Sequence, residues 1–252
     1  MKLDLHIHAK ERSGCSGAGE EEMIQAAIRF GLDGLAFTDH GRLVPIERLD
    51  ELNRRYAPFR VFGGIEVFTS EGEDTLVYGV RDPALERGDW SYASLWEFAK
   101  SRGGFVAIAH PLRYRDHLRV DVAKCPPDAI ELHSINIGRC DEEHIRRLAE
   151  QIGCKLLCNS DAHSIDCVGM YHMQFDRSVQ TEAELLECLR AGVFAGCAAV
   201  ERVETFNDNV RRRELVIRGM IAEGQDRKFY RETTGEWDGF FDRVAIGKSY
   251  EI

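Results

Sequence analysis

The chain contains 252 residues, of which 44% are hydrophobic and 30% are charged. This balance predicts a globular chain with a sizeable core and excludes disorder as its main state. The formal net charge of −10 has the wrong sign for binding duplex nucleic acid through phosphate neutralisation. The sequence has no apolar run near the roughly 18 residues that span a bilayer, and no signal peptide follows Met1. We therefore expect a cytoplasmic protein whose partners include neither duplex nucleic acid nor a membrane.

Seven short apolar runs predict β-strands in the first 200 residues. They cover residues 2–8, 34–38, 61–67, 75–80, 105–109, 129–133 and 155–160. Stretches of helical character separate them, with apolar residues at spacings of three and four over residues 23–30, 95–99 and 145–152. The pair Thr181 and Glu184 forms a capping box, which predicts the start of a further helix. This alternation of strands and helices predicts an α/β domain.

The character of the chain changes at about residue 201. A charged stretch over residues 207–223 predicts a helix, and an aromatic-rich tail without any strand-helix rhythm follows it. We therefore divide the chain into a first part, residues 1–200, and a C-terminal extension, residues 201–252. We expect the extension to pack against the first part or against a second subunit, which would make a homo-oligomer. The alternative is a lid that contributes to a substrate pocket.

Residues that commonly bind metal ions lie at or just after the ends of six of the seven predicted strands. They are His6 and His8, Asp39 with His40, Glu66, His110, His133, and Asp161 with His163. The carboxyl ends of parallel strands form one face of an α/β fold, and active sites lie on that face. Because strand side chains alternate in direction, His6 and His8 point the same way and can reach one cation. A structural role would explain any one of these residues, but their convergence on one rim predicts a metal site.

The same residues lie in five ordered motifs. The motifs are Asp4-Leu5-His6-Ile7-His8, Thr38-Asp39-His40, Gly64-Ile65-Glu66, Ala109-His110-Pro111 and Ser160-Asp161-Ala162-His163. This ordered set resembles the four motifs and the bridging glutamate of the PHP (polymerase and histidinol phosphatase) family, over roughly residues 1–200. The resemblance implies a distorted seven-stranded β/α barrel with a two- or three-metal site at its mouth that hydrolyses phosphoesters.

The resemblance also implies a role for each residue. A first metal ion would take His6, His8, Glu66 and Asp161. Glu66 would bridge to a second ion that also takes His110. A third ion would take His40 and His163.

The chain departs from the family pattern at two places. The loop after His8 lacks the histidine or aspartate that often completes the third site, which leaves Cys15, Glu11 and Glu20 as substitutes. The region of the fourth strand lacks a histidine for the second ion, and His133 is our candidate to replace it.

Imidazole and carboxylate ligands together favour zinc, manganese or iron. Two such ions would activate a water molecule as hydroxide and orient it towards the phosphorus atom. Asp161 would orient the hydroxide or carry its proton, and His40 or His163 would protonate the leaving oxygen if the third ion is absent. Arg113 and Arg139 are the candidate side chains for binding the substrate phosphate. The expected partner is therefore a small anionic phosphoester.

Three other functions share some of these features. A nuclease that acts on single-stranded ends would use the same phosphodiester chemistry. A metal amidohydrolase would also begin with a histidine pair on its first strand, but it usually has histidines on the middle strands and often a bridging lysine. A non-catalytic metal-binding module would be expected to have lost some ligands.

Overall fold

The computed structural model describes residues 1–252 and contains one mixed β-sheet of nine strands. The strands are β1 (Lys2–Ile7), β2 (Gly34–Phe37), β3 (Arg60–Phe68), β4 (Asp74–Tyr78), β5 (Phe105–Ile108), β6 (Ala129–His133), β7 (Lys155–Cys158), β8 (Tyr171–Phe175) and β9 (Phe194–Ala198). Their order across the sheet is β7-β6-β5-β4-β3-β2-β1-β8-β9. β1, β2 and β3 are parallel, as are β5, β6 and β7, whereas β4 runs antiparallel to both of its neighbours. All seven predicted strands therefore form, as β1 to β7.

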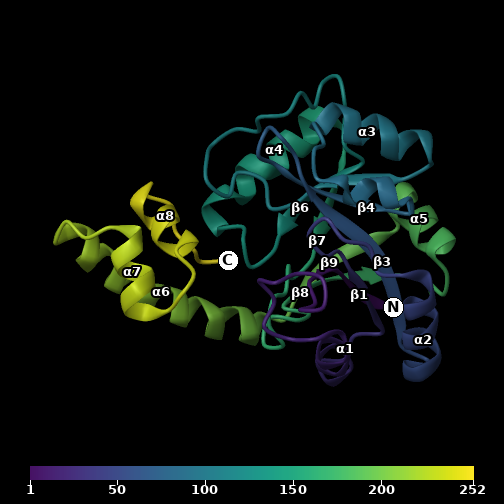
Figure 1. The fold of residues 1–252 in the computed structure, drawn as a ribbon, viewed down its shortest axis with the longest axis horizontal. Helices are drawn as coiled ribbons and strands as arrows, with labels where there is room; N and C mark the ends of the chain where they lie inside the picture. Colours follow the sequence, from purple (N-terminus) through teal and green to yellow (C-terminus); the bar gives the residue numbers. More distant parts are fainter.

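The two ends of the sheet curve towards each other, so that the sheet forms a nearly closed barrel (Figure 1). The backbone N–H of Cys158 at the end of β7 donates to Met173 Sδ on β8 at 3.1 Å. The sheet has nine strands rather than the expected seven. The two additional strands, β8 and β9, were not predicted. The residues of β9 are exposed or half-buried and lack the alternation that marks a half-buried strand.

Helices cover the outside of the sheet and form the C-terminal extension. They are α1 (Glu20–Arg29), α2 (Ile46–Tyr56), α3 (Tyr92–Ser101), α4 (Glu142–Ile152), α5 (Glu182–Ala191), α6 (Val200–Ala222), α7 (Arg227–Thr234) and α8 (Gly239–Ala245), with two short 3-10 helices, η1 (Pro83–Arg87) and η2 (Arg139–Asp141). The predicted capping box is confirmed, because Thr181 Oγ1 accepts from the Glu184 N–H and Glu184 Oε2 accepts from the Thr181 N–H. α2 was not predicted, and it has neither a side-chain cap at its start nor a glycine at its end.

β1 lies inside the molecule and is buried on both faces. Leu3 and Leu5 belong to the main apolar core, while Asp4, His6 and His8 on the opposite face are also fully buried. Because side chains alternate along a strand, β1 serves the apolar core with one face and supplies polar groups with the other. Such buried polar groups need partners, and their partners form the site described below.

The C-terminal extension projects from the barrel as α6, α7 and α8 (Figure 1). The three helices share a small apolar core of their own, which includes Tyr230 and Phe241. Lys248 Nζ donates to the backbone oxygens of Leu112 at 2.6 Å and Arg115 at 2.7 Å, and to Asp141 Oδ1 at 2.8 Å. These bonds anchor the extension on the loops that follow β5 and β6.

None of the helices is both long and apolar enough to cross a membrane.

Candidate metal centre

Four side chains from three strands meet at the mouth of the barrel. His6 Nε2 lies 3.3 Å from Asp161 Oδ1 and 3.5 Å from Glu66 Oε1. His8 Nε2 lies 3.2 Å from Asp161 Oδ1 and 3.3 Å from Glu66 Oε2. All four residues are between 0 and 1% exposed. The predicted ligands of the first metal ion therefore surround one small buried space.

One atom of each of these residues has no hydrogen-bond partner. The four atoms are His6 Nε2, His8 Nε2, Asp161 Oδ1 and Glu66 Oε2, of which the last lies 2.8 Å from His40 Nδ1 without hydrogen-bond geometry. Burying unpaired polar atoms is costly, so folded proteins seldom leave them without a partner. Two imidazole nitrogens and two carboxylate oxygens that face a common space are a suitable donor set for a divalent transition-metal ion. The residues present thus fit the cation that the motifs imply.

Glu66 connects this group to a second one. His110 Nε2 lies 3.0 Å from Glu66 Oε1 and 3.8 Å from Asp74 Oδ2. Glu66, Asp74 and His110 place one ligand atom each within 4.8 Å of one another. The carboxylate of Glu66 therefore lies between two ligand groups, as a bridging ligand would.

Asp74 was not predicted, because ligands were expected only at the carboxyl ends of strands. β4 runs antiparallel to β3 and β5, so its amino end, where Asp74 lies, reaches the mouth of the barrel. Burial, reinforced by the charge of Glu66, raises the pKa of Asp74 to about 6. Asp74 is half-buried, and the only mark of it in the sequence is its position directly before the apolar run of β4.

His133 does not join the cluster, contrary to the prediction. Its ring stacks on Tyr171, with the ring centroids 5.0 Å apart, and its Nδ1 lies 3.8 Å from Glu142 Oε1. The pairing of β6 with β7 is irregular between Glu131 and His133, so these two residues do not follow regular alternation. Glu131, rather than His133, is the β6 residue that faces the site.

Glu131 holds two of the histidines in place, although it was not predicted as a site residue. Its Oε1 lies 3.0 Å from His6 Nδ1, and its Oε2 accepts from the His110 N–H at 2.9 Å. A carboxylate on the far nitrogen of a metal-binding imidazole fixes the tautomer and orients the ring. A buried carboxylate in the middle of an apolar strand was the signal for this residue.

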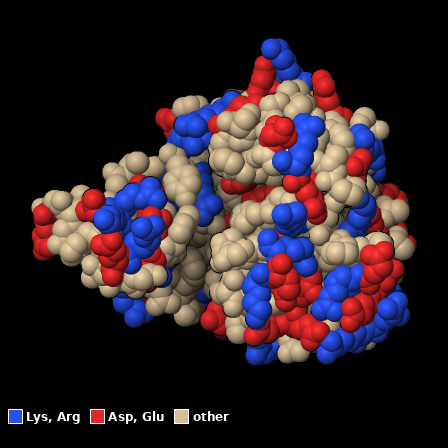
Figure 2. All heavy atoms as spheres, viewed as in Figure 1, with Lys and Arg blue, Asp and Glu red and all other residues tan.

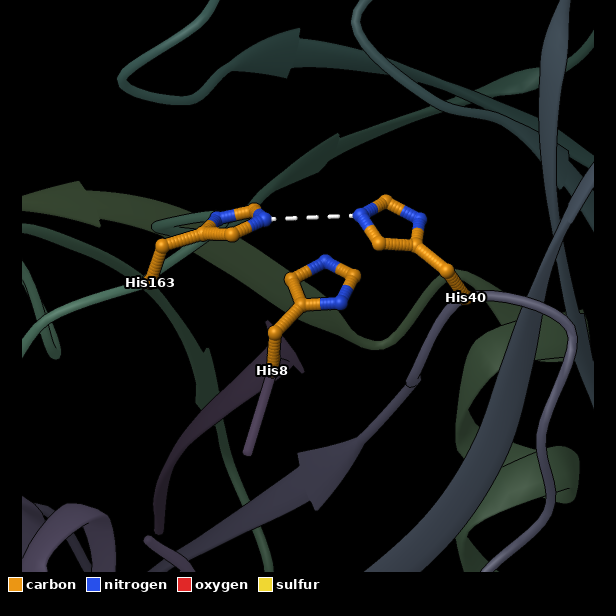
Figure 3. A group of neighbouring side chains, drawn as sticks. All are labelled: His8, His40 and His163. Carbon is orange, nitrogen blue, oxygen red and sulfur yellow. Dashed lines mark hydrogen bonds between the residues drawn. The ribbon is translucent and has the colours of Figure 1, made fainter. Parts of the chain in front are cut away.

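A third group contains His8, His40 and His163 (Figure 3). His163 Nε2 lies 3.4 Å from His40 Nε2, and each ring is stacked against that of His8. Cys15 lines the same cavity as His40 and His163, and contacts with both imidazoles lower its pKa to about 6 although partial burial opposes this change. Of the expected substitute ligands, Cys15 is thus the one beside this group.

The other two candidate substitutes have partners elsewhere. Glu20 forms ion pairs with Arg12 and Arg48. Glu11 accepts a hydrogen bond from the Glu20 N–H at 3.1 Å. Neither carboxylate is therefore placed to complete the third group.

The charges of the cluster set its protonation. Burial alone would raise the pKa of Asp161 and of Glu66, but the neighbouring imidazoles, above all His6, hold both well below their usual range. Burial lowers the pKa of His8 to about 3. The carboxylates are thus ionised and His8 is neutral near pH 7, which are the forms that bind a cation. Burial opposes protonation of His6, but the neighbouring carboxylates, above all Asp161, raise its pKa well above the usual value, so His6 would release a proton when a cation binds.

Arg113 is linked to the cluster through Asn136. Arg113 Nη2 donates to Asn136 Oδ1 at 2.7 Å, and Asn136 Nδ2 donates to Asp161 Oδ2 at 2.6 Å. Asp161 has a backbone φ of 55°, a conformation that residues other than glycine seldom adopt. The orientation of Asp161 is therefore set by its backbone conformation and by the hydrogen bond to Oδ2. The same chain of hydrogen bonds places Arg113 next to the site.

Arg139, the other predicted phosphate-binding residue, lies elsewhere. It forms an ion pair with Glu204 of α6, and its Nε donates to the backbone oxygen of Ile252 at 2.7 Å. It does not line the cavity beside the cluster. The contacts of Arg139 hold the extension on the barrel, which corrects the prediction made from its position after β6.

A cavity of about 710 Å³ opens in front of the cluster. The barrel contributes His40, His110, Arg113, Asp161 and His163 to its lining, and the extension contributes Phe206, Arg213, Arg231, Trp237 and Phe240. The space-filling view shows Lys or Arg side chains along the crevice between the extension and the barrel (Figure 2). The extension therefore both packs against the barrel and lines the cavity.

Comparison with known proteins gives a family match for part of the chain. Residues 143–194 match the family model described as PHP-associated. No curated protein matches the chain in sequence.

Three solved structures share the fold at low sequence identity. PsfC from Pseudomonas syringae PB-5123 is 17% identical, with a TM-score of 0.62, over 85% of this chain and 98% of that chain. A two-domain protein from Bacteroides vulgatus that contains a predicted PHP-like metal-dependent phosphoesterase is 15% identical, with a TM-score of 0.57, over 79% and 64% of the two chains. An amidohydrolase from Chromobacterium violaceum with bound sulfate is 18% identical, with a TM-score of 0.57, over 80% and 100%.

The PHP-associated match lies within residues 1–200, the part of the chain that carries the five ordered motifs. The fold shared with the PHP-like protein extends over 79% of this chain.

Proposed function

We propose that the chain is a metal-dependent hydrolase that cleaves a small phosphoester. The observation that carries this proposal is the set of four unpaired atoms on His6, His8, Glu66 and Asp161, which face one buried space beside an open cavity. Bound divalent ions would supply an activated water molecule and charge neutralisation for the phosphoryl oxygens.

The ligand groups fit two or three ions of zinc, manganese or iron. The first group is His6, His8, Glu66 and Asp161, the second is Glu66, Asp74 and His110, and the third is His8, His40 and His163. Glu66 belongs to two groups because its carboxylate offers two oxygens, whereas the imidazole of His8 offers one free nitrogen and would serve either the first or the third group. Mixed nitrogen and oxygen ligands favour these metals over magnesium or calcium.

The chain's own residues would then position the substrate and move protons. Arg113 lies beside the cluster and would hold phosphate oxygens through its guanidinium group. As the oxygen of water bonds to phosphorus and the ester P–O bond breaks, Asp161 would accept the proton of the water. If the third ion is absent, His40 or His163, which line the cavity, would donate a proton to the departing oxygen.

Elemental analysis followed by a phosphoester panel tests this proposal. The protein loaded with Mn, Zn or Fe is expected to hold at least two ions per chain and to hydrolyse phosphate monoesters or bis-(p-nitrophenyl) phosphate. The variant His110→Ala should lose the second ion, whereas His133→Ala, which removes a ring outside the cluster, should retain both. Fewer than two ions under every loading condition would contradict the proposal.

Amide hydrolysis is the second candidate, because a protein of the same fold is an amidohydrolase. The position of Arg113 favours a phosphoester, since a guanidinium fork matches the oxygens of phosphate. Adding amide substrates and single-stranded oligonucleotides to the same panel separates the three activities. Turnover of amides alone would replace the phosphoesterase proposal, and turnover of oligonucleotides without small esters would narrow it to a nuclease.

A further inference from the structure

The cavity has two unlike ends. The barrel end consists of imidazoles and carboxylates, and the opposite wall carries three aromatic side chains of the extension, Phe206, Trp237 and Phe240. A metal cluster needs no aromatic wall to hydrolyse a phosphate group. The wall is therefore placed to contact the organic part of a bound ester.

Trp237 is the aromatic residue of this wall with a free surface. It lies in the cavity lining, and 44% of its surface is exposed. Phe240 contacts it edge to face, with the ring centroids 5.4 Å apart. The guanidinium carbon of Arg113 lies 4.6 Å from the centroid of the Trp237 ring. These two contacts fix the orientation of the indole while part of it remains open to a ligand.

Arg113 also sets the relation between the two ends of the cavity. Its guanidinium packs on Trp237 and donates to Asn136, whose side chain donates in turn to Asp161. The indole is thus linked to Asp161 of the metal cluster through one guanidinium group and one amide group. A phosphate held by Arg113 at the cluster would place a ring joined to it by a short linker beside the indole.

Two arginines lie on the wall opposite the metal cluster, but neither is suited to bind a second anionic group of the ligand. Arg213 makes two hydrogen bonds to the carboxylate of Glu236, at 2.7 and 3.2 Å, and packs on Phe240. Its charge is therefore neutralised, and its flat guanidinium extends the stacking surface. Arg231 has a distant partner, Asp238 at 3.6 Å, but its side chain is 59% exposed and therefore strongly screened.

We infer that the extension selects phosphate esters whose organic part carries a flat aromatic ring, with Trp237 as the surface on which the ring stacks. The inference rests on the proposed function, because the ring is placed relative to a phosphate held at the metal cluster. The cavity volume of about 710 Å³ lies within the usual range of ligand pockets and would admit a nucleoside monophosphate. Stacking of a base on an aromatic side chain contributes about 1–3 kcal/mol.

A matched pair of substrates tests this inference on the metal-loaded protein. Adenosine 5′-monophosphate and ribose 5-phosphate share the scissile ester and differ by the ring. Wild-type kcat/KM should be at least about tenfold higher for the nucleotide than for ribose 5-phosphate, and Trp237→Ala should lower this ratio about tenfold or more. Phe229→Ala, which removes an exposed aromatic side chain of the same extension outside the cavity, should leave the ratio unchanged.

Calorimetry with the same two compounds adds a readout that does not depend on turnover. The nucleotide should bind more tightly than ribose 5-phosphate to the wild type, and Trp237→Ala should remove that difference. Equal losses for both compounds, or no preference for the ring in the wild type, would overturn the inference even if both esters are hydrolysed. Absence of hydrolysis for every ester in a protein that holds two ions would instead overturn the proposed function, and the calorimetric preference would then decide the inference by itself.

Discussion

The barrel mouth and the wall contributed by the extension face each other across one cavity, but they are built differently. At the mouth, the side chains of His6, His8 and Glu66 are fully buried, and strands hold them. On the wall, Trp237 is 44% exposed and lies between two short helices, α7 and α8. Cation binding requires several atoms at fixed separations, which strands provide. Recognition of a ring requires one flat surface, which an added helical segment can supply.

The largest effect is expected from removing the charge shared by the ligand groups. Glu66→Gln keeps the shape of the side chain but loses the anionic oxygens that lie near His6, His8, His40 and His110. We expect kcat/KM to fall by more than about 100-fold for every substrate, because outer partners of metal ligands alone account for 10- to 100-fold. Steady-state kinetics together with metal analysis measures the change. A variant that retains two ions and normal turnover would show that hydrolysis does not take place at the mouth of the barrel.

A smaller loss is expected when the support of the ligands is removed. Glu131→Gln keeps the volume of the side chain but weakens the contacts with His6 Nδ1 and the His110 N–H. Metal affinity should fall by about 10- to 100-fold, as for other carboxylates that orient metal-binding histidines. Competition with a chromophoric chelator measures this affinity. An unchanged affinity would show that the packing of the barrel alone orients His6.

Arg113 lies between the barrel mouth and the wall of the extension, so a variant at this position tests how the two regions contribute to substrate binding. Arg113→Ala should raise KM about tenfold and change kcat less, because a charged hydrogen bond contributes about 1.5–3 kcal/mol and this one is expected to bind substrate and transition state alike. Arg139→Ala is the matched control, since this arginine binds Glu204 and Ile252 outside the cavity. An equal change of KM in both variants would show that the effect comes from a displaced extension.

The last effect is on stability rather than on activity, and it concerns the metal-free mouth in acid. Burial lowers the pKa of His8 to about 3, whereas a histidine in the unfolded chain titrates at about 6.5. Between these values the unfolded state binds more protons, so the free energy of unfolding should fall as the pH drops below about 6.5. One such group contributes at most about 1.4 kcal/mol per pH unit.

Urea unfolding of the wild type and of His8→Gln from pH 7 to pH 4 measures this contribution. The variant lacks the titrating imidazole, so its stability should depend less steeply on pH over this range. Equal slopes for the two proteins would mean that His8 is charged in the folded state.

The mouth of the barrel was largely predictable because its residues follow parallel strands. His6, Glu66, His110 and Asp161 come at or after the ends of apolar runs, and the geometry of parallel strands brings such positions together. Asp74 escaped this reasoning because β4 is antiparallel. The direction of a strand depends on its pairing partners, and the alternation of apolar residues does not encode it.

Two further misses arose from local irregularity and from long-range packing. The irregular pairing of β6 with β7 separates Glu131 from His133, and an irregularity of one residue leaves no mark on composition. The position of Trp237 at the cavity depends on how α6 leaves the barrel and on anchors such as Lys248. Contacts between residues more than 100 positions apart decide that placement. Local sequence patterns could therefore predict the helix over residues 207–223, but not that aromatic residues of the extension line the cavity.

Because β4 is antiparallel to β3, the length of the connection between these strands decides whether Asp74 faces the second ligand group. Phe68 pairs with Asp74 across this hairpin, and the Thr69 N–H donates to the Glu73 oxygen at 3.0 Å to close the turn. Deleting or inserting one residue in 69–73 would slip the register and turn Asp74 to the other side of the sheet. Changes in this loop that keep the carboxylate at the mouth should therefore come two residues at a time.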